Sequence, residues 1–304
     1  MEQFKFKRGL DDTFVERLNQ LYEDGDWWKK LVDDRGLFLA IRDDYVNLYY
    51  KGASILKLTW YPIAESIVGE IHYKYLIRPK LLGRTSPSIR VEDGNAILPD
   101  LHHIFLDTIS DVSLIKRTAN RYAGNEKSSV HYVAQKDSNK VFDLEVAFSE
   151  EDEESTPRMD LAALRQAGEG VEVVFFEAKE FSNHKELRKR YEENAKVVEQ
   201  IQQYSRILRN NSDAIIRSYR RVCKNLHELQ GVAQRFPKRS AILKCIADGS
   251  TKLTINEQPR LLIMGCDQDQ IKGEKWRPHR DKLEDSFPGR VRVVGSGKSV
   301  SLNW

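Results

Sequence analysis

The sequence is poor in cysteine and has no long apolar segment. Its 304 residues include three cysteines, and no two of them have the Cys-x-x-Cys spacing of a structural zinc site. No stretch approaches the roughly eighteen apolar residues that a membrane-spanning helix needs. No apolar segment follows the first charged residues, as it would in a secretory signal. We therefore expect a cytoplasmic protein with neither a disulfide framework nor a membrane partner.

The chain also lacks a strong net charge. Its 49 basic and 46 acidic residues give +3, which by itself indicates no particular partner. The charge is unevenly distributed, because residues 184–224 carry eleven Lys or Arg against five acids, whereas residues 150–154 are all acidic. The basic segment is suited to a phosphate backbone, or is an ordinary solvated helix with Glu–Lys pairs. For the acidic run, we prefer a solvated loop to a shield over a site.

Hydrophobic periodicity predicts an α/β protein with two domains. Apolar residues recur at helical spacing over residues 12–35, with a glycine break before Trp27. The β-branched and aromatic runs that follow predict strands at 37–41, 45–50, 54–60 and 70–77. We interpret residues 79–94 as a long loop and 100–121 as a helix. Residues 1–95 are thus expected to form an N-terminal α+β accessory domain, and residues 96–304 a second domain.

The second domain alternates apolar strands with charged helices. The predicted strands are 141–148, 158–164, 171–179, 260–266 and 291–294. The predicted helices of the basic region are 184–211 and 213–236.

A carboxylate and an ammonium group end the most apolar of these strands. Glu177 and Lys179 are two positions apart, so they project from the same face, whereas Ala178 faces the opposite side. The pattern Asp/Glu-x-Lys occurs nowhere else in the sequence. Charged groups that end a buried strand usually have a function or a partner. A simple salt-bridge cluster at the sheet edge is the structural alternative.

The hairpin before Glu177 is expected to bring a second carboxylate nearby. If the turn is centred on Glu169, antiparallel pairing sets Asp160 level with Ala178. A shift of one residue would instead aim Asp160 at Glu177 and Lys179. The sequence therefore predicts that Asp160 lies near Glu177 and Lys179, but it does not decide on which face of the sheet.

The strand before Asp160 offers a third carboxylate. Pairing about the preceding loop places Asp160 level with Val146, which makes Glu145 the nearest upstream acid. Carboxylate oxygens are the ligands that Mg²⁺ or Mn²⁺ prefers, and Mg²⁺ keeps several waters and substrate phosphate oxygens. Such a set with a lysine would suit metal-assisted hydrolysis of phosphodiesters.

These residues and their order resemble the PD-(D/E)XK nuclease superfamily. Asp160 precedes Glu177-x-Lys179 on the next strand, with a helix and a strand before them and a helix and a strand after. Gln200 and Tyr204 resemble the QxxxY motif of the RecB-like members and share one helix face. Met159 precedes Asp160, where the family motif has proline. The likeness covers roughly residues 100 to 270.

The resemblance implies a restriction-endonuclease-like mixed sheet flanked by helices, and a role for each residue of the site. In this family Lys179 would serve the attacking water, and Gln200 and Tyr204 would orient substrate or site. The implied metal ligands are Asp160, Glu177, the main-chain carbonyl of Ala178 and, from the strand pairing above, Glu145.

The function expected from the resemblance is that of a Mg²⁺- or Mn²⁺-dependent (endo)deoxyribonuclease. DNA is favoured over RNA as the substrate, and a second copy of the chain or an activating protein are further candidate partners. A short nuclease with an accessory domain is similar to bacterial and phage-defence or restriction effectors. The alternative is a non-catalytic nucleic-acid or protein interaction module that retains the fold.

Overall fold

The protein is an α/β chain with two sheets, as predicted. The computed structural model describes residues 6–25, 27–76, 88–97, 111–148, 157–188 and 195–302. The chain forms two compact units, each assembled from segments distant in the sequence. Unit 1 comprises Met1–Lys7, Gly124–Ser218 and Gly249–Trp304. Unit 2 comprises Arg8–Ala123 and Tyr219–Asp248, so the region after the predicted boundary at residue 95 contributes to both units.

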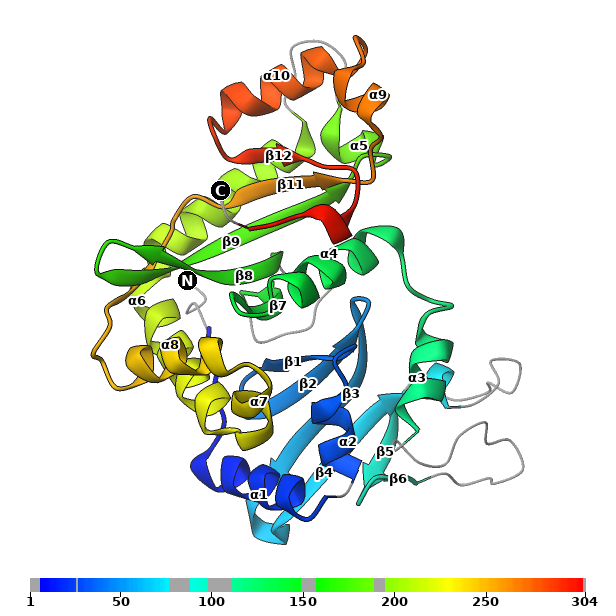
Figure 1. Ribbon diagram of the computed structural model, residues 1–304, viewed down its shortest axis with the longest axis vertical. Coiled ribbons are helices and arrows are strands. Elements are labelled where there is room, and N and C mark those ends of the chain that lie inside the picture. The colour runs from blue at the N-terminus through cyan, green and yellow to red at the C-terminus, as the bar shows by residue number, and fades with distance from the viewer. Residues whose placement is uncertain are drawn as a thin grey trace, which may run out of the picture. The chain divides into compact units, whose positions relative to one another are not determined.

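Unit 2 contains an antiparallel sheet in which each strand pairs with the next (Figure 1). Its strands are β1 (Phe38–Ile41), β2 (Tyr45–Tyr50), β3 (Ala53–Tyr61), β4 (Ser66–His72), β5 (Ser88–Glu92) and β6 (Asn95–Ala96). The first three confirm the predicted strands. The strand predicted at 70–77 begins four residues earlier and ends in a 3₁₀ turn at Tyr73–Tyr75. The loop prediction for 79–94 is wrong at β5, where buried Ile89 and Val91 alternate with exposed polar residues.

The helical region predicted at 12–35, with its glycine break, forms two helices of unit 2. The helices of this unit are α1 (Asp12–Glu23), α2 (Trp27–Asp33), α3 (Val112–Ala119), α7 (Gln230–Arg235), α8 (Pro237–Ala247) and the C-terminal end of α6. The predicted helix 12–35 is broken near Gly25, whose φ of 77° is incompatible with a continuing helix. Only α3 of the predicted helix 100–121 can be compared, because residues 98–110 lie outside the described residues.

Unit 1 contains a mixed sheet in the order β12-β11-β9-β8-β7, with β10 also beside β9. The strands are β7 (Val141–Ala147), β8 (Arg158–Ala167), β9 (Gly170–Glu180), β10 (Leu253–Ile255), β11 (Arg260–Met264) and β12 (Val291–Val293). Strands β7, β8 and β9 are antiparallel, whereas β10 and β11 run parallel to β9 and β12 runs parallel to β11. All five predicted strands are confirmed, and β10 is additional. The acidic run at 150–154 lies outside the described residues.

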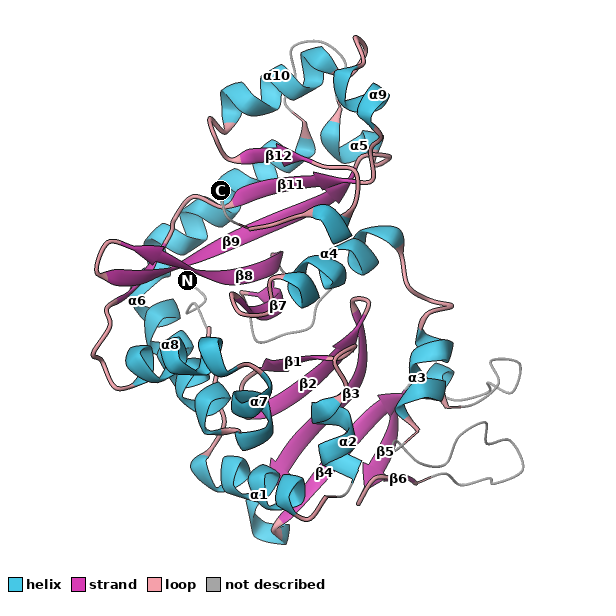
Figure 2. Cartoon of the chain, viewed as in Figure 1, coloured by secondary structure: helices cyan, strands magenta, loops and turns pink. Residues whose placement is uncertain are grey.

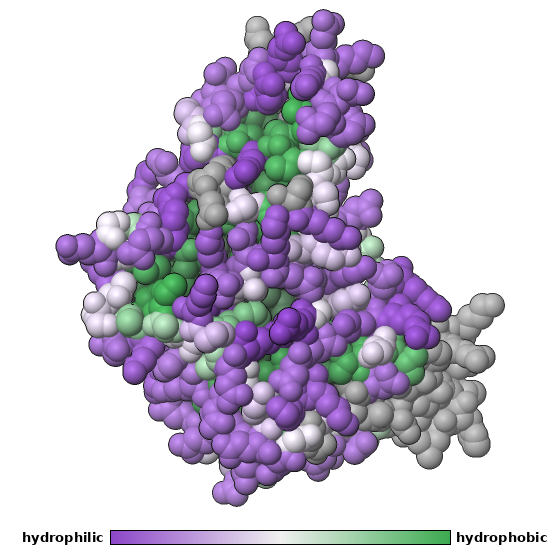
Figure 3. All heavy atoms as spheres, viewed as in Figure 1, coloured by the Kyte–Doolittle hydropathy of each residue, from purple (hydrophilic) through white to green (hydrophobic). Residues whose placement is uncertain are grey.

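The helices of unit 1 flank this sheet (Figure 2). They are α4 (Asn125–Lys136), α5 (His184–Leu187), α9 (Gln268–Lys272), α10 (Arg277–Ser286) and the N-terminal part of α6 (Lys196–Glu228). The predicted helix 184–211 corresponds to α5 and the first part of α6. The predicted helix 213–236 corresponds to the rest of α6, which continues through a kink at Asn211, and to α7. Hydrophilic side chains cover unit 1 around α10 (Figure 3). No helix in the described ranges has the length and apolar character needed to cross a bilayer.

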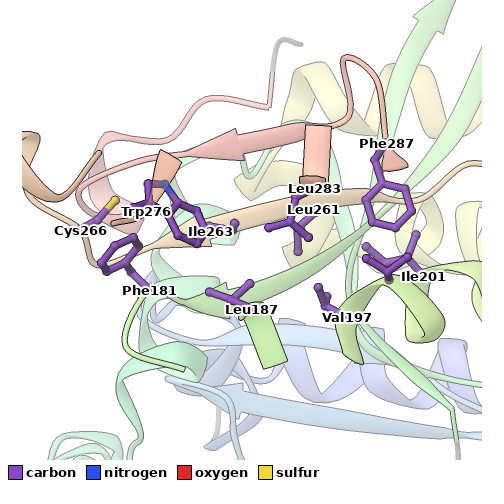
Figure 4. Packing of buried hydrophobic residues seen from close by; sticks show 11 residues of the cluster. Phe181, Leu187, Val197, Ile201, Leu261, Ile263, Cys266, Trp276, Leu283 and Phe287 are labelled. Carbon is purple, nitrogen blue, oxygen red and sulfur yellow. The ribbon is translucent and has the colours of Figure 1, made fainter. Parts of the chain in front are cut away.

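An apolar cluster holds the first turns of α6 against the sheet of unit 1. Val197 and Ile201 of α6 pack with Leu261 and Ile263 of β11, all of them fully buried (Figure 4). Burial of each such side chain contributes about 1.5–3 kcal/mol. This packing fixes the N-terminal part of α6 on the sheet.

Candidate active site

The β8–β9 hairpin decides which face Asp160 occupies. Its pairs run from Ala167–Gly170 to Leu161–Phe176, so the turn is centred between Gly168 and Glu169. One further step sets Asp160 level with Glu177. The register centred on Glu169 is therefore wrong, and the one-residue shift is confirmed. Directly opposed residues share a face, so Asp160 lies on the face of Glu177.

The β7–β8 pairing brings Glu145 to the same level. The pairs Leu144–Leu161 and Val146–Met159 bracket Glu145 and Asp160, so Glu145, and not the predicted Val146, lies opposite Asp160. Glu145 has a φ of 50°, the left-handed region that costs a non-glycine residue about 1–2 kcal/mol. A strained backbone at a candidate site residue is typical of functional positions.

The Glu145 carboxylate lies between two cations. Its oxygens are 3.3 Å from Lys127 Nζ and 3.7 Å from Arg158 Nη1, and the side chain is largely buried. Glu145 is thus an ion-paired neighbour of Asp160, whose pKa its charge helps to raise.

Glu177 and Lys179 form a buried pair on β9. The Lys179 ammonium donates to Glu177 Oε1 at 2.6 Å, and the two residues are only 8% and 2% exposed. On β11, Leu261 lies beside Glu177 and Ile263 lies beside Lys179. Both belong to the apolar cluster, so the charged pair shares its face of the sheet with that cluster. The second carboxylate oxygen, Glu177 Oε2, is buried and accepts no hydrogen bond from the residues that the structure describes.

Asp160 is held by the strand beside it. Its Oδ2 accepts a hydrogen bond of 2.7 Å from the main-chain N–H of Ala178. Burial raises the pKa of Asp160 well above its usual range, and the nearby charges of Glu177 and Glu145 raise it further, against the opposing effect of the Ala178 N–H and Lys179. Two neighbouring carboxylates, Glu177 and Glu145, therefore repel the ionised form of Asp160.

The protonation of the Glu177–Lys179 pair follows from the same balance. Burial raises the pKa of Glu177 to about 7, although Lys179 and Gln200 favour the ionised form. Burial disfavours the ammonium of Lys179, but the charge and hydrogen bond of Glu177, together with the charges of Asp160 and Glu126, outweigh burial and raise the pKa of Lys179 above the ordinary lysine value. Lys179 therefore remains charged at neutral pH, whereas Glu177 changes its protonation there.

Gln200 and Tyr204 share one face of α6, as their spacing predicted, and this face is turned towards Glu177 and β8. Gln200 Nε2 donates to the Tyr204 hydroxyl at 2.7 Å, and this hydroxyl donates to the main-chain carbonyl of Arg158. Tyr204 is buried, and Gln200 contributes to stabilising ionised Glu177. The pair thus connects α6 with β8, the strand that carries Asp160.

One carboxylate of this region was not predicted from the sequence. Glu126, in the first turn of α4, accepts a 3.0 Å hydrogen bond from the main-chain N–H of Glu180, and its charge raises the pKa of Glu177. The helical spacing of Val130, Val133 and Ala134 was the signal for α4.

A groove of about 850 Å³ opens from Lys179 and runs along α6 within unit 1. Polar side chains line it, among them Gln200, Gln203 and Arg206. The buried pair is thus reached from a surface large enough to hold a substrate segment.

The carboxylates of the site can be compared with the ligands that a divalent cation such as Mg²⁺ requires. Within the described parts of the chain, no group of three or more His, Cys, Asp or Glu side chains is arranged to hold a metal ion. Mg²⁺ needs only one or two protein carboxylates, since water and phosphate oxygens complete its shell. The unpartnered Glu177 Oε2 and the raised pKa of Asp160 and of Glu177 fit a site where a cation would offset the repulsion.

Comparisons with protein families, curated proteins and solved structures find no match to this chain.

Proposed function

We propose that the protein is a metal-dependent nuclease that hydrolyses phosphodiester bonds, with DNA favoured over RNA. The observation that carries the proposal is the convergence of Asp160, Glu177 and Lys179 from two adjoining strands in a buried region. Mutually repelling buried carboxylates cost stability, and such groups cluster at functional sites.

The order of elements also supports a restriction-endonuclease-like domain. Helix α4 and strand β7 precede the Asp160 strand β8 and the Glu177-x-Lys179 strand β9, and α6 and β11 follow. The mixed directions of the sheet agree with the architecture that the sequence resemblance implied.

Asp160, Glu177 and the main-chain carbonyl of Ala178 would hold Mg²⁺ or Mn²⁺, with Glu145 as an additional charge beside Asp160. A bound ion would supply Lewis-acid polarisation of the phosphate and a nucleophilic water at neutral pH. Lys179 is charged in the pair with Glu177, so it acts as a hydrogen-bond donor that orients the water or offsets charge at phosphorus.

The remaining residues position this group. Tyr204 and Gln200 fix α6 against β8, and Gln200 favours the ionised form of Glu177. The Ala178 N–H fixes the rotamer of Asp160 through its Oδ2. Both carboxylates are thereby preorganised, which lowers the cost of ordering them during reaction.

The proposal is tested by incubating the purified protein with plasmid, linear and single-stranded DNA and with RNA, in Mg²⁺, Mn²⁺ or EDTA. Glu177→Gln and Lys179→Ala are each expected to reduce cleavage by about 10²-fold or more. Matched controls are Glu172→Gln, which changes another β9 carboxylate, paired with Arg165 at 2.6 Å, and Lys185→Ala at an exposed lysine.

Cleavage that survives both site substitutions would overturn the assignment of these residues. Binding of nucleic acid without cleavage in any metal would favour the alternative, a non-catalytic module that retains the fold.

A further inference from the structure

The groove beside Lys179 is formed mostly by one face of α6. Gln200, Gln203, Ile207 and Asn210 line it, and their spacing of three or four residues places them in a row along the helix. At 1.5 Å per residue, the row from Gln200 to Asn210 is about 15 Å long. We call this groove, with its end at Lys179, the α6 trough.

The chemistry of the α6 trough suits a sugar-phosphate backbone. Lys196 and Arg206 are exposed cations, and Gln203 and Asn210 are exposed amides that both donate and accept hydrogen bonds. These are the side-chain types that contact phosphate and sugar oxygens in nucleic-acid complexes.

The charge and shape of the trough favour one strand over two. Its charged lining residues are three cations and two acids, Lys179, Lys196, Arg206, Glu186 and Glu199. Duplex DNA carries one charge per roughly 1.7 Å of its axis, twice the density of one strand. A helix that reads a duplex inserts into the major groove as a convex element, whereas this helix lines a concave volume of about 850 Å³.

We propose that the α6 trough binds a single nucleic-acid strand by its backbone and leads it to Lys179, with Arg206 as the principal phosphate contact. The inference rests on the proposed function and names its substrate form, an unpaired strand or a frayed end. Arg206 is six residues from Gln200, about 9 Å along the helix. In a stacked strand that distance corresponds to two or three nucleotides from the scissile phosphate.

The strand-binding test uses fluorescence anisotropy of a labelled single-stranded oligonucleotide and of its duplex, in Ca²⁺ with the full-length protein. Arg206→Gln is the test variant. The matched control is Arg209→Gln, which changes an exposed arginine of the same helix that pairs with Glu257 at 3.2 Å outside the trough. Wild-type protein is expected to bind the single strand more tightly than the duplex. Arg206→Gln should weaken that binding about fivefold or more and lower the salt slope by about 0.7, whereas Arg209→Gln stays within about twofold.

Single-strand affinity that is unchanged by Arg206→Gln, or a preference for duplex, would overturn the inference. Cleavage in Mg²⁺, measured alongside, separates it from the proposed function. If the protein cleaves DNA but its affinity for the single strand does not depend on Arg206, strand binding in the α6 trough is refuted and the proposed nuclease function is not. If binding depends on Arg206 but no cleavage occurs, strand binding in the α6 trough is supported and the nuclease function is refuted. If the protein shows no binding and no cleavage, both proposals are refuted.

Discussion

Replacing Asp160 by asparagine is expected to stabilise the metal-free protein while removing a residue of the proposed site. Asparagine has the same shape, and its Oδ1 can accept the hydrogen bond from the Ala178 N–H. It carries no charge, so the repulsion from Glu177 and Glu145 and the cost of burying an ionised carboxylate both disappear.

The magnitude follows from Coulomb's law and one hydrogen bond. Two like charges about 5 Å apart at an effective dielectric constant of 20 repel by about 3 kcal/mol. The hydrogen bond from the Ala178 N–H is weaker to a neutral acceptor than to a charged one, which reduces the gain in stability by about 1 kcal/mol. The free energy of unfolding should therefore rise by about 2 kcal/mol at pH 8, which corresponds to roughly 4–8 °C in Tm for a unit of this size.

The sign of the pH dependence is fixed by the direction of the pKa shift. Because the pKa of Asp160 is raised in the folded state, folded wild-type protein binds more protons than unfolded protein above pH 3.8. Its stability therefore falls as pH rises through that window, and the Asp160→Asn variant lacks this loss. The difference between variant and wild type should grow from pH 5 to pH 8.

The assay is urea unfolding in EDTA at pH 5 and pH 8. Asp285→Asn, a neutralised carboxylate exposed on α10, is the control and should leave the pH dependence unchanged. A variant that is no more stable than wild type at pH 8, or a gain that is equal at both pH values, would refute the reasoning.

Three further predictions concern the surrounding residues. Tyr204→Phe should cost about 1–2 kcal/mol in urea unfolding, because the part-buried bond from the Tyr204 hydroxyl to the Arg158 carbonyl is lost and Gln200 loses its acceptor; an unchanged midpoint would contradict this role. Glu145→Gly should be more stable than Glu145→Ala by about 1 kcal/mol by thermal unfolding, since glycine adopts the φ of 50° without strain, and equal melting temperatures would count against strain at this position. Apparent Mg²⁺ affinity, measured from cleavage at limiting metal, should increase from pH 6 to pH 8 because the pKa of Glu177 is about 7; a flat profile would mean that Glu177 is already ionised.

The strands were the most predictable part of the fold. A short, continuous apolar run such as Val173–Phe176 is typical of a strand that is buried on both faces, and β9 forms where this run indicated it. Helix α4 was missed because its sequence is mostly polar and Gly124 offers no side-chain cap. Strand β5 was missed because its short alternating pattern lies among proline, glycine and serine, which usually indicate a loop.

The residues of the site could be predicted from the sequence, but the face of the sheet on which Asp160 lies could not. Glu177 and Lys179 share a face by strand periodicity alone, whereas the face of Asp160 depends on a one-residue choice of register. The two-residue turn Gly168–Glu169 decides that choice, and the φ of 58° at Gly168 is typical of the hairpin turns that glycine permits. Glu126 reaches the site only through the docking of α4 on the sheet, which no local pattern specifies.

The most direct measurement is the single-turnover rate of cleavage of labelled single-stranded DNA in Mg²⁺ by wild-type protein and by Asp160→Asn. Because this variant is expected to be folded and more stable, lost activity cannot be attributed to unfolding. The proposed function predicts metal-dependent cleavage by wild-type protein and a rate lower by about 10²-fold or more in the variant. Cleavage at the wild-type rate by Asp160→Asn would contradict the assignment of this site.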